Sequence, residues 1–168
     1  MPVSISPELM MESRLAALKL FLDALDVPAD ISSMAGRKSI QKAVYLGQRA
    51  GIDLGYRFGW YIRGPYSPPL ATAYYELAEA VAAGEQPGRE LRDDLRNRLA
   101  PVRDALRLPA DIGLAPDDWA ELLASLHYLE KVRGLDSAVA RQTISKEKNR
   151  LLPYVDRAQG ALAAAGLM

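Results

Sequence analysis

The sequence predicts a mostly α-helical protein of several helices with one small β element near residues 56–63. Apolar residues recur at helical spacing in most of the segments between prolines and glycines. The first such stripe consists of Met11, Leu15, Leu18, Leu22 and Leu25. One aromatic segment instead alternates with a period of two, which is typical of a strand. A length of 168 residues with 49% apolar residues suits one domain with a hydrophobic core.

Local signals set the expected helix boundaries. Ser6 and Pro7 predict the start of a first helix, which ends near Asp26. The other helices are expected over residues 37–50, 68–84, 89–107, 116–133, 136–145 and 153–165. Gly51 is expected to end the second of them in a left-handed conformation. Pro101 is expected to split the helix over 89–107 into two shorter pieces.

The predicted strand places Tyr56, Phe58, Trp60 and Ile62 on one side, and we expect this side to face the core. Gly64–Pro65 is expected to end the strand, and residues 64–67 to form a turn into the next helix, capped by Ser67. A single strand leaves its backbone groups unpaired, so it needs a partner. The candidates are residues 110–114, residues 3–5 or another chain. The unpaired strand and the Ala-rich last helix also suggest a homodimer.

Charge is balanced overall but uneven along the chain. Twenty-one Lys and Arg residues offset 21 Asp and Glu residues. By direct count, the net charge is −3 over residues 1–30, +5 over 37–63, −4 over 111–136 and +3 over 137–168. A basic block with interleaved aromatic residues is typical of a nucleic-acid or phosphate surface. The favoured alternative is that the acidic first helix lies against the basic second helix.

Composition excludes several classes of chemistry. The absence of cysteine excludes disulfides, thiolate metal sites and cysteine nucleophiles, and the single His127 excludes mechanisms that need two histidines. Adjacent carboxylates at 93–94 and 117–118 are expected to point to different helix faces rather than to converge. Phosphate loops, dinucleotide fingerprints and hydrolase motifs are absent. We therefore expect no enzymatic activity, metal or cofactor, and the lack of a signal peptide or membrane-length segment predicts a cytoplasmic protein.

The aromatic segment and the helix before it supply the first candidate site. Tyr, Trp and Arg are the residue types that dominate binding hot spots. The predicted partner-binding residues are Lys42, Tyr45, Tyr61, Arg63, Gly64, Pro65 and Tyr66. Arg63 also lies beside the expected start of the helix over 68–84, where free amides favour an anion. An enzyme with an anion pocket at Arg63 and Tyr66 is therefore a third hypothesis.

The C-terminal quarter supplies the second candidate site. Residues 114–168 are expected to form a helix-turn-helix-like unit, either as part of a single domain 1–168 or as a winged-helix-like subdomain. The last segment, VDRAQGALAAAGLM, is similar to recognition helices of winged-helix proteins. The candidate nucleic-acid-binding residues are Lys146, Lys148, Arg150 and Arg157. The Ala-rich helix offers few groups to base edges, so packing or dimerisation is an equal alternative.

The run RKSIQKAVYLGQRAGIDLGYRFGWYIRGPYSPPL resembles the YwgA-like proteins and the related Panacea (SocA-antitoxin-like) domain. The matching residues are Ile40, Gln41, Lys42, Val44, Tyr45, Leu46, Tyr56, Phe58, Tyr61 and Gly64 to Ser67. The likeness covers about residues 10–168, although an Arg- and Asp-rich segment between Gly84 and Pro116 lies outside the Panacea pattern. The resemblance implies a mostly helical domain that acts without catalysis. The expected function is a protein-binding regulator, antitoxin-like or defence-associated, whose partner is a protein such as a toxin.

Overall fold

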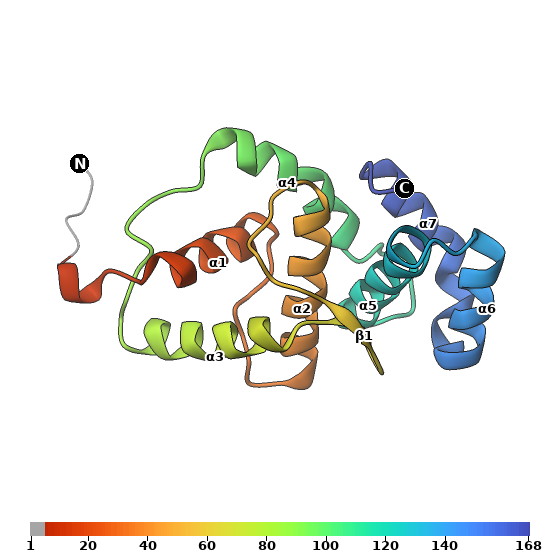
Figure 1. Ribbon diagram of the computed structural model, residues 1–168, viewed down its shortest axis with the longest axis horizontal. Helices are drawn as coiled ribbons and strands as arrows, with labels where there is room; N and C mark the ends of the chain where they lie inside the picture. The colour runs from red at the N-terminus through yellow and green to blue at the C-terminus, as the bar shows by residue number, and fades with distance from the viewer. Residues whose placement is uncertain (1–5) are drawn as a thin grey trace.

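The computed structural model describes residues 6–168, and the predicted mostly α-helical fold is confirmed (Figure 1). Seven α-helices, three short helical turns and one hairpin follow one another within these residues. In chain order they are η1 (Pro7–Leu9), α1 (Ser13–Ala24), α2 (Met34–Arg49), β1 (Gly59–Tyr61), β2 (Gly64–Tyr66), α3 (Pro68–Ala82), α4 (Asp93–Leu106), α5 (Pro116–His127), the π-helical turn η2 (Tyr128–Val132), α6 (Ser137–Glu147), η3 (Asn149–Tyr154) and α7 (Val155–Ala164).

Side-chain caps and glycines define several of the helix ends. The Ser67 hydroxyl accepts a hydrogen bond from the Leu70 amide at the start of α3, and the Asp136 carboxylate accepts one from the Val139 amide at the start of α6. Gly51 follows α2 with a φ of +98°, as predicted. These boundaries depend on residues next to the helix end, which is why the sequence predicts them.

Several predicted helix boundaries are corrected: α2 begins at Met34 rather than at residue 37, and α4 begins at Asp93 rather than at residue 89. The first α-helix begins at Ser13, because the segment before it pairs with Gln86 in a parallel bridge. Pro101 does not split α4, which is continuous. Pro101 lies on the exposed side, where water can reach the carbonyl group that lacks an amide partner. Pro153 lies within η3, and α7 begins two residues later.

The predicted strand pairs with the residues that directly follow it, contrary to expectation. β1 and β2 form an antiparallel hairpin in which Tyr61 lies opposite Gly64, so that Ile62 and Arg63 form the turn. The φ of +87° at Gly64 permits this reversal, and proline is tolerated in a two-stranded hairpin because both strands are edges. Residues 110–114 form no strand, and residues 3–5 lie outside the described part of the chain. The strand therefore no longer argues for a homodimer.

Ile62 differs from the predicted core position. Its side chain is 90% exposed, whereas Phe58 and Trp60 pack against the core as expected. The chain reverses direction directly after Tyr61, so the alternation of the strand does not extend to residue 62.

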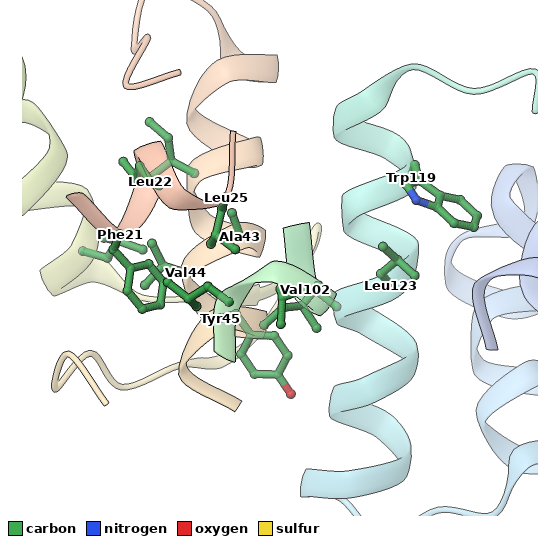
Figure 2. Close-up of a cluster of buried hydrophobic side chains, with 14 of the residues drawn as sticks. Phe21, Leu22, Leu25, Ala43, Val44, Tyr45, Val102, Trp119 and Leu123 are labelled. Atoms are coloured by element: carbon green, nitrogen blue, oxygen red, sulfur yellow. The ribbon is translucent and has the colours of Figure 1, made fainter. Parts of the chain in front are cut away.

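Helix α2 lies at the centre of the molecule. It contacts α1, α3, α4, α5 and β2. Figure 2 shows its Ala43, Val44 and Tyr45 among side chains from the neighbouring helices. One continuous cluster of buried residues extends from Met11 in the N-terminal part to Leu167 near the C-terminus. None of the helices within residues 6–168 is long and apolar enough to cross a membrane.

Candidate functional site

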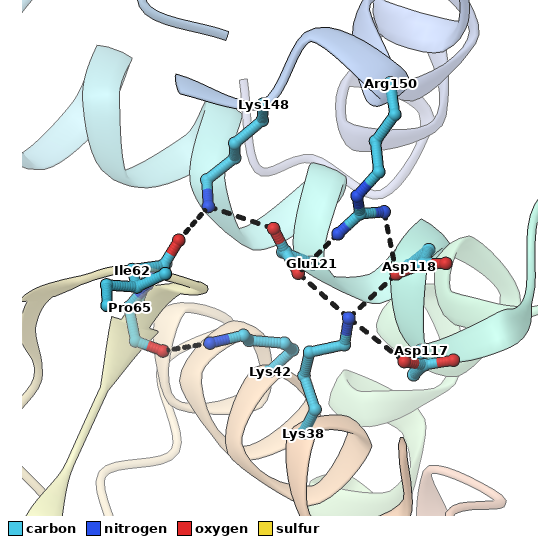
Figure 3. Close-up of polar contacts among 9 residues, drawn as sticks. All are labelled: Lys38, Lys42, Ile62, Pro65, Asp117, Asp118, Glu121, Lys148 and Arg150. Carbon is cyan, nitrogen blue, oxygen red and sulfur yellow. Dashed lines mark hydrogen bonds and ion pairs between the residues drawn. The ribbon is translucent and has the colours of Figure 1, made fainter. Parts of the chain in front are cut away.

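A network of buried charges joins α2 to the start of α5 (Figure 3). The Lys38 ammonium group lies 3.0 Å from a carboxylate oxygen of Asp117, 2.8 Å from one of Asp118 and 2.9 Å from one of Glu121. The adjacent carboxylates Asp117 and Asp118 thus converge on one cation, contrary to expectation. Lys38 and Glu121 are both buried. Burial of paired charges is tolerated when hydrogen bonds satisfy each group, and Lys38 uses its donors in this way.

The same carboxylates also bind two cations from the C-terminal part. The Lys148 ammonium group lies 2.9 Å from Glu121, and the Arg150 guanidinium lies 2.9 Å from Asp118 and 3.4 Å from Glu121. Burial alone favours the neutral acid at Glu121. Hydrogen bonds from Lys38 and Lys148 outweigh it and hold the pKa of Glu121 below its usual value. The network therefore joins α2, α5 and η3.

The acidic first helix lies against the basic second helix, as expected, but it does not neutralise it. The contact is apolar, with Phe21 of α1 against Gly47 of α2. Two carboxylates of the first segment pair with its own cations: Glu12 with Arg14, and Asp23 with Lys19. The carboxylates that neutralise Lys38 come instead from the acidic segment 111–136, because α5 packs directly against α2.

Side chains of α2 and of Lys148, the residue between α6 and η3, hold the hairpin in place. Lys42 donates a 2.6 Å hydrogen bond to the carbonyl oxygen of Pro65, and Lys148 donates one of 2.6 Å to that of Ile62. The Gln41 side chain donates to the carbonyl oxygen of Ser67 and accepts from its amide. These contacts fix the hairpin turn and the entry to α3 relative to α2.

Lys42 is the least neutralised of the buried cations. Its side chain is 1% exposed, and among residues 6–168 its only hydrogen-bond acceptor is the carbonyl oxygen of Pro65. Burial, reinforced by the positive charges of Lys148, Lys38 and Arg63 and opposed by Glu121, lowers the pKa of Lys42 to about 7. Lys42 therefore loses its proton at a much lower pH than an exposed lysine does.

A pocket of about 350 Å³ opens between α2, the hairpin and α3. It is lined by Met34, Arg37, Lys38, Gln41, Lys42, Tyr61, Ile62, Arg63, Tyr66, Tyr74 and Tyr75. The lining contains four tyrosines and four cations but no carboxylate. Such a combination of aromatic walls with a few polar groups is typical of a binding site.

Exposed apolar side chains surround the same pocket. The exposed fraction is 50% for Met34, 50% for Tyr61, 90% for Ile62 and 49% for Tyr75. These residues come from α2, the hairpin and α3, so the fold gathers them from three segments. Apolar groups gathered on a surface in this way indicate an interaction site.

The structure places the predicted partner-binding residues at different depths. Lys42, Tyr61, Arg63 and Tyr66 line the pocket. Gly64 and Pro65 are buried in β2 and shape the hairpin. Tyr45 does not belong to this surface: it is buried against α5.

The sequence prediction of the site did not include seven of the pocket residues. The missed residues with aromatic or apolar side chains are Met34, Ile62, Tyr74 and Tyr75, and those with polar side chains are Arg37, Lys38 and Gln41. Arg37 and Gln41 belong to the same helix as Lys42, which could have indicated them. Met34 is the first residue of the same helix, but the predicted helix begins only at residue 37. Tyr75 belongs to α3 and reaches the pocket only through packing between elements, so nothing local in the sequence indicates its role.

Most of the predicted nucleic-acid-binding cations are neutralised within the fold. Lys148 is buried and Arg150 pairs with the carboxylates of α5. Arg157 makes two hydrogen bonds to Asp111, of 2.8 and 3.0 Å. Arg150 and Arg157 are exposed but paired. Lys146 is exposed as well, and it makes no ion pair with any residue from 6 to 168. Nucleic-acid binding through these residues stays a prediction.

His127 is part of the core. Its Nδ1 lies 2.8 Å from the Tyr45 hydroxyl, and both side chains are buried. Burial, with smaller contributions from Arg49 and Lys131, lowers the pKa of His127 to about 4, so the ring is neutral at physiological pH. In the described part of the chain, no group of three or more His, Asp or Glu side chains is placed to hold a metal ion.

Comparisons of the chain with protein-family models, curated proteins and solved structures gave no match. The resemblance to the YwgA-like and Panacea families therefore stays a prediction.

Proposed function

We propose that the protein is a non-enzymatic, protein-binding regulator that contacts its partner through the hairpin and the pocket beside it. The observation that carries this proposal is the gathering of exposed Met34, Tyr61, Ile62 and Tyr75 around one cation-lined pocket. Tyrosine and arginine at the centre of such a surface are the residue types that contribute most to protein–protein affinity. An antitoxin-like or defence-associated role, with a toxin as partner, is the particular form that we propose.

The experiment is quantitative capture from cells of the native source. Tagged wild-type protein is compared with a Tyr61→Ala, Arg63→Ala double variant, which removes an exposed aromatic and an exposed cationic side chain from the surface. The matched control is Val139→Ala with Lys146→Ala, which removes an exposed apolar and an exposed cationic side chain from α6. Mass spectrometry should find one protein in near-stoichiometric amount with wild type and control, strongly reduced with the hairpin variant.

The result must also distinguish binding from folding. Circular dichroism and thermal unfolding of the double variant should match wild type, because Tyr61 and Arg63 are exposed in the hairpin. Equal capture by all three proteins, or no stoichiometric partner with wild type, would contradict the proposal. If the captured protein is toxic, co-expression of wild type but not of the hairpin variant should restore growth.

A further inference from the structure

The positive charge at the pocket is only partly neutralised. Lys38 is matched by three carboxylates of α5 and is not available to a ligand. Arg37 donates to the carbonyl oxygen of Ile31, and Lys42 donates only to the carbonyl oxygen of Pro65. Arg63 is exposed at the hairpin turn and makes no ion pair with any residue in the described part of the chain. The pocket therefore has a surplus of positive charge that a ligand can neutralise.

The pocket floor differs from its rim. Gln41, Lys42 and Tyr74 are buried at the floor, whereas Tyr61 and Tyr75 are half exposed at the rim. The hollow offers apolar ring surface, and the cations lie beside it. A ligand that fits both features carries an apolar side chain next to an anionic group.

The apolar surface also extends beyond the hollow. Ile62 is 90% exposed, so a molecule that only filled a hollow of about 350 Å³ would leave most of this side chain in water. A peptide segment can fill the hollow and cover the hairpin turn at the same time. A second copy of the chain that used the same face symmetrically would bring the Arg63 side chains of both copies close together, which is unfavourable.

We propose that the pocket receives an acidic segment of the partner protein, an inference that rests on the proposed function. An apolar side chain of this segment enters the tyrosine-lined hollow, and a neighbouring Asp or Glu carboxylate binds the guanidinium of Arg63. Arginine suits this role because its planar group can donate two parallel hydrogen bonds to one carboxylate.

The test selects short random peptides by display on the immobilised wild-type protein. The selected peptides should combine Asp or Glu with a neighbouring Leu, Phe, Tyr or Trp. A synthetic peptide of the selected sequence should lose about tenfold or more in affinity when its acidic residues are replaced by their amides, as expected for loss of a charge-assisted hydrogen bond.

Variants of the protein locate the binding site. Arg63→Gln should reduce the affinity of the synthetic peptide by a similar factor of about ten. The control is Arg57→Gln, which removes the same charge from an exposed residue that does not line the pocket, and it should leave the affinity unchanged. Arg63→Glu, used in a second selection, should replace acidic peptides by basic ones. Both Arg63 variants should unfold at the wild-type temperature.

Several results would overturn the inference. These are an absence of selected peptides, selection without acidic residues, or equal affinity for wild type and Arg63→Gln. Concentration-dependent dimerisation that Ile62→Asp abolishes would assign the surface to a second copy instead. The proposed function is judged separately, because loss of capture with the Tyr61→Ala, Arg63→Ala variant would still show the contact surface even if its partner segment were not acidic.

Discussion

At the scale of the single residue, Lys42 combines burial with incomplete pairing. It lies on α2 beneath the hairpin, where Lys38, Lys148 and Arg63 add positive charge around it and Glu121 is the one carboxylate that opposes them. The cost of keeping a buried ammonium group charged lowers its pKa to about 7. A lysine in the unfolded chain titrates near 10.4. The two states therefore bind different numbers of protons above neutral pH.

This difference predicts how stability changes with pH. Above about pH 7 the folded protein releases the Lys42 proton while the unfolded chain keeps it up to about pH 10, so stability rises with pH in this range. The slope from this group is at most ~1.4 kcal/mol per pH unit, and it fades as the pH falls below the folded pKa, because both states then become protonated. Lys42→Met should remove this slope. Urea denaturation between pH 6 and about 10 measures the difference from wild type.

Lys146→Met serves as the control, because Lys146 is exposed on α6 and should show no such change in slope. If the unfolding free energies of wild type and Lys42→Met changed with pH in parallel, Lys42 would titrate alike in the folded and unfolded states, and the prediction would be wrong.

At the scale of the element, the contact between α1 and α2 depends on a glycine. Figure 2 shows Phe21 of α1 beside α2, and a methyl group at Gly47 would overlap the Phe21 ring. Gly47→Ala should therefore destabilise the protein by about 1–3 kcal/mol, as overpacking does in other cores. Gly160→Ala in α7 is the matched control, because a methyl group there meets no atom within 4 Å.

The control should raise stability by up to ~1 kcal/mol, because alanine favours a helix over glycine. Urea denaturation measures the change in unfolding free energy for both variants. A decrease for Gly47→Ala with an increase for Gly160→Ala would establish the close packing of α1 on α2, and changes of equal sign would contradict it.

The elements differ in how far the sequence predicts them. Caps such as Ser67 and Asp136 act within one helical turn, so local reading places the starts of α3 and α6 correctly. The hairpin was missed because Gly64–Pro65 indicates a turn, and proline seldom pairs in a sheet. Its pairing depends on Lys42 and on other side chains distant in sequence, which hold β2 against α2. The local sequence does not show this support, because it comes from contacts between segments that lie far apart along the chain.

At the scale of the whole molecule, the opposed charge blocks neutralise one another through α5. The sequence shows that a basic block and an acidic block exist, but not which blocks meet. Lys38 and Asp118 are 80 positions apart, and only the packing of α5 on α2 joins them. The sequence likewise does not show which segments come together at the pocket. Arg63 and Tyr66 were predicted because they lie in one segment, whereas Tyr75 comes from another helix.

The network around Glu121 predicts acid sensitivity of the whole fold. Hydrogen bonds hold the pKa of Glu121 below its value in the unfolded chain, about 4.3. Its stabilisation is therefore present above that value and is lost as the pH falls through the lower folded pKa. Glu121→Gln leaves Lys38 and Lys148 buried without their shared carboxylate, so at pH 7 it should cost about 3–5 kcal/mol.

The difference in unfolding free energy between wild type and Glu121→Gln should shrink in acid, because Glu121 of the wild type is then neutral as well. Urea denaturation from pH 7 to about pH 3 measures both effects, with Glu79→Gln, an exposed position on α3, as the control that changes neither. A constant difference between wild type and Glu121→Gln across this range would contradict the linkage. Because the network joins α2, α5 and η3, its loss should appear as one cooperative transition rather than as local unfolding of α7.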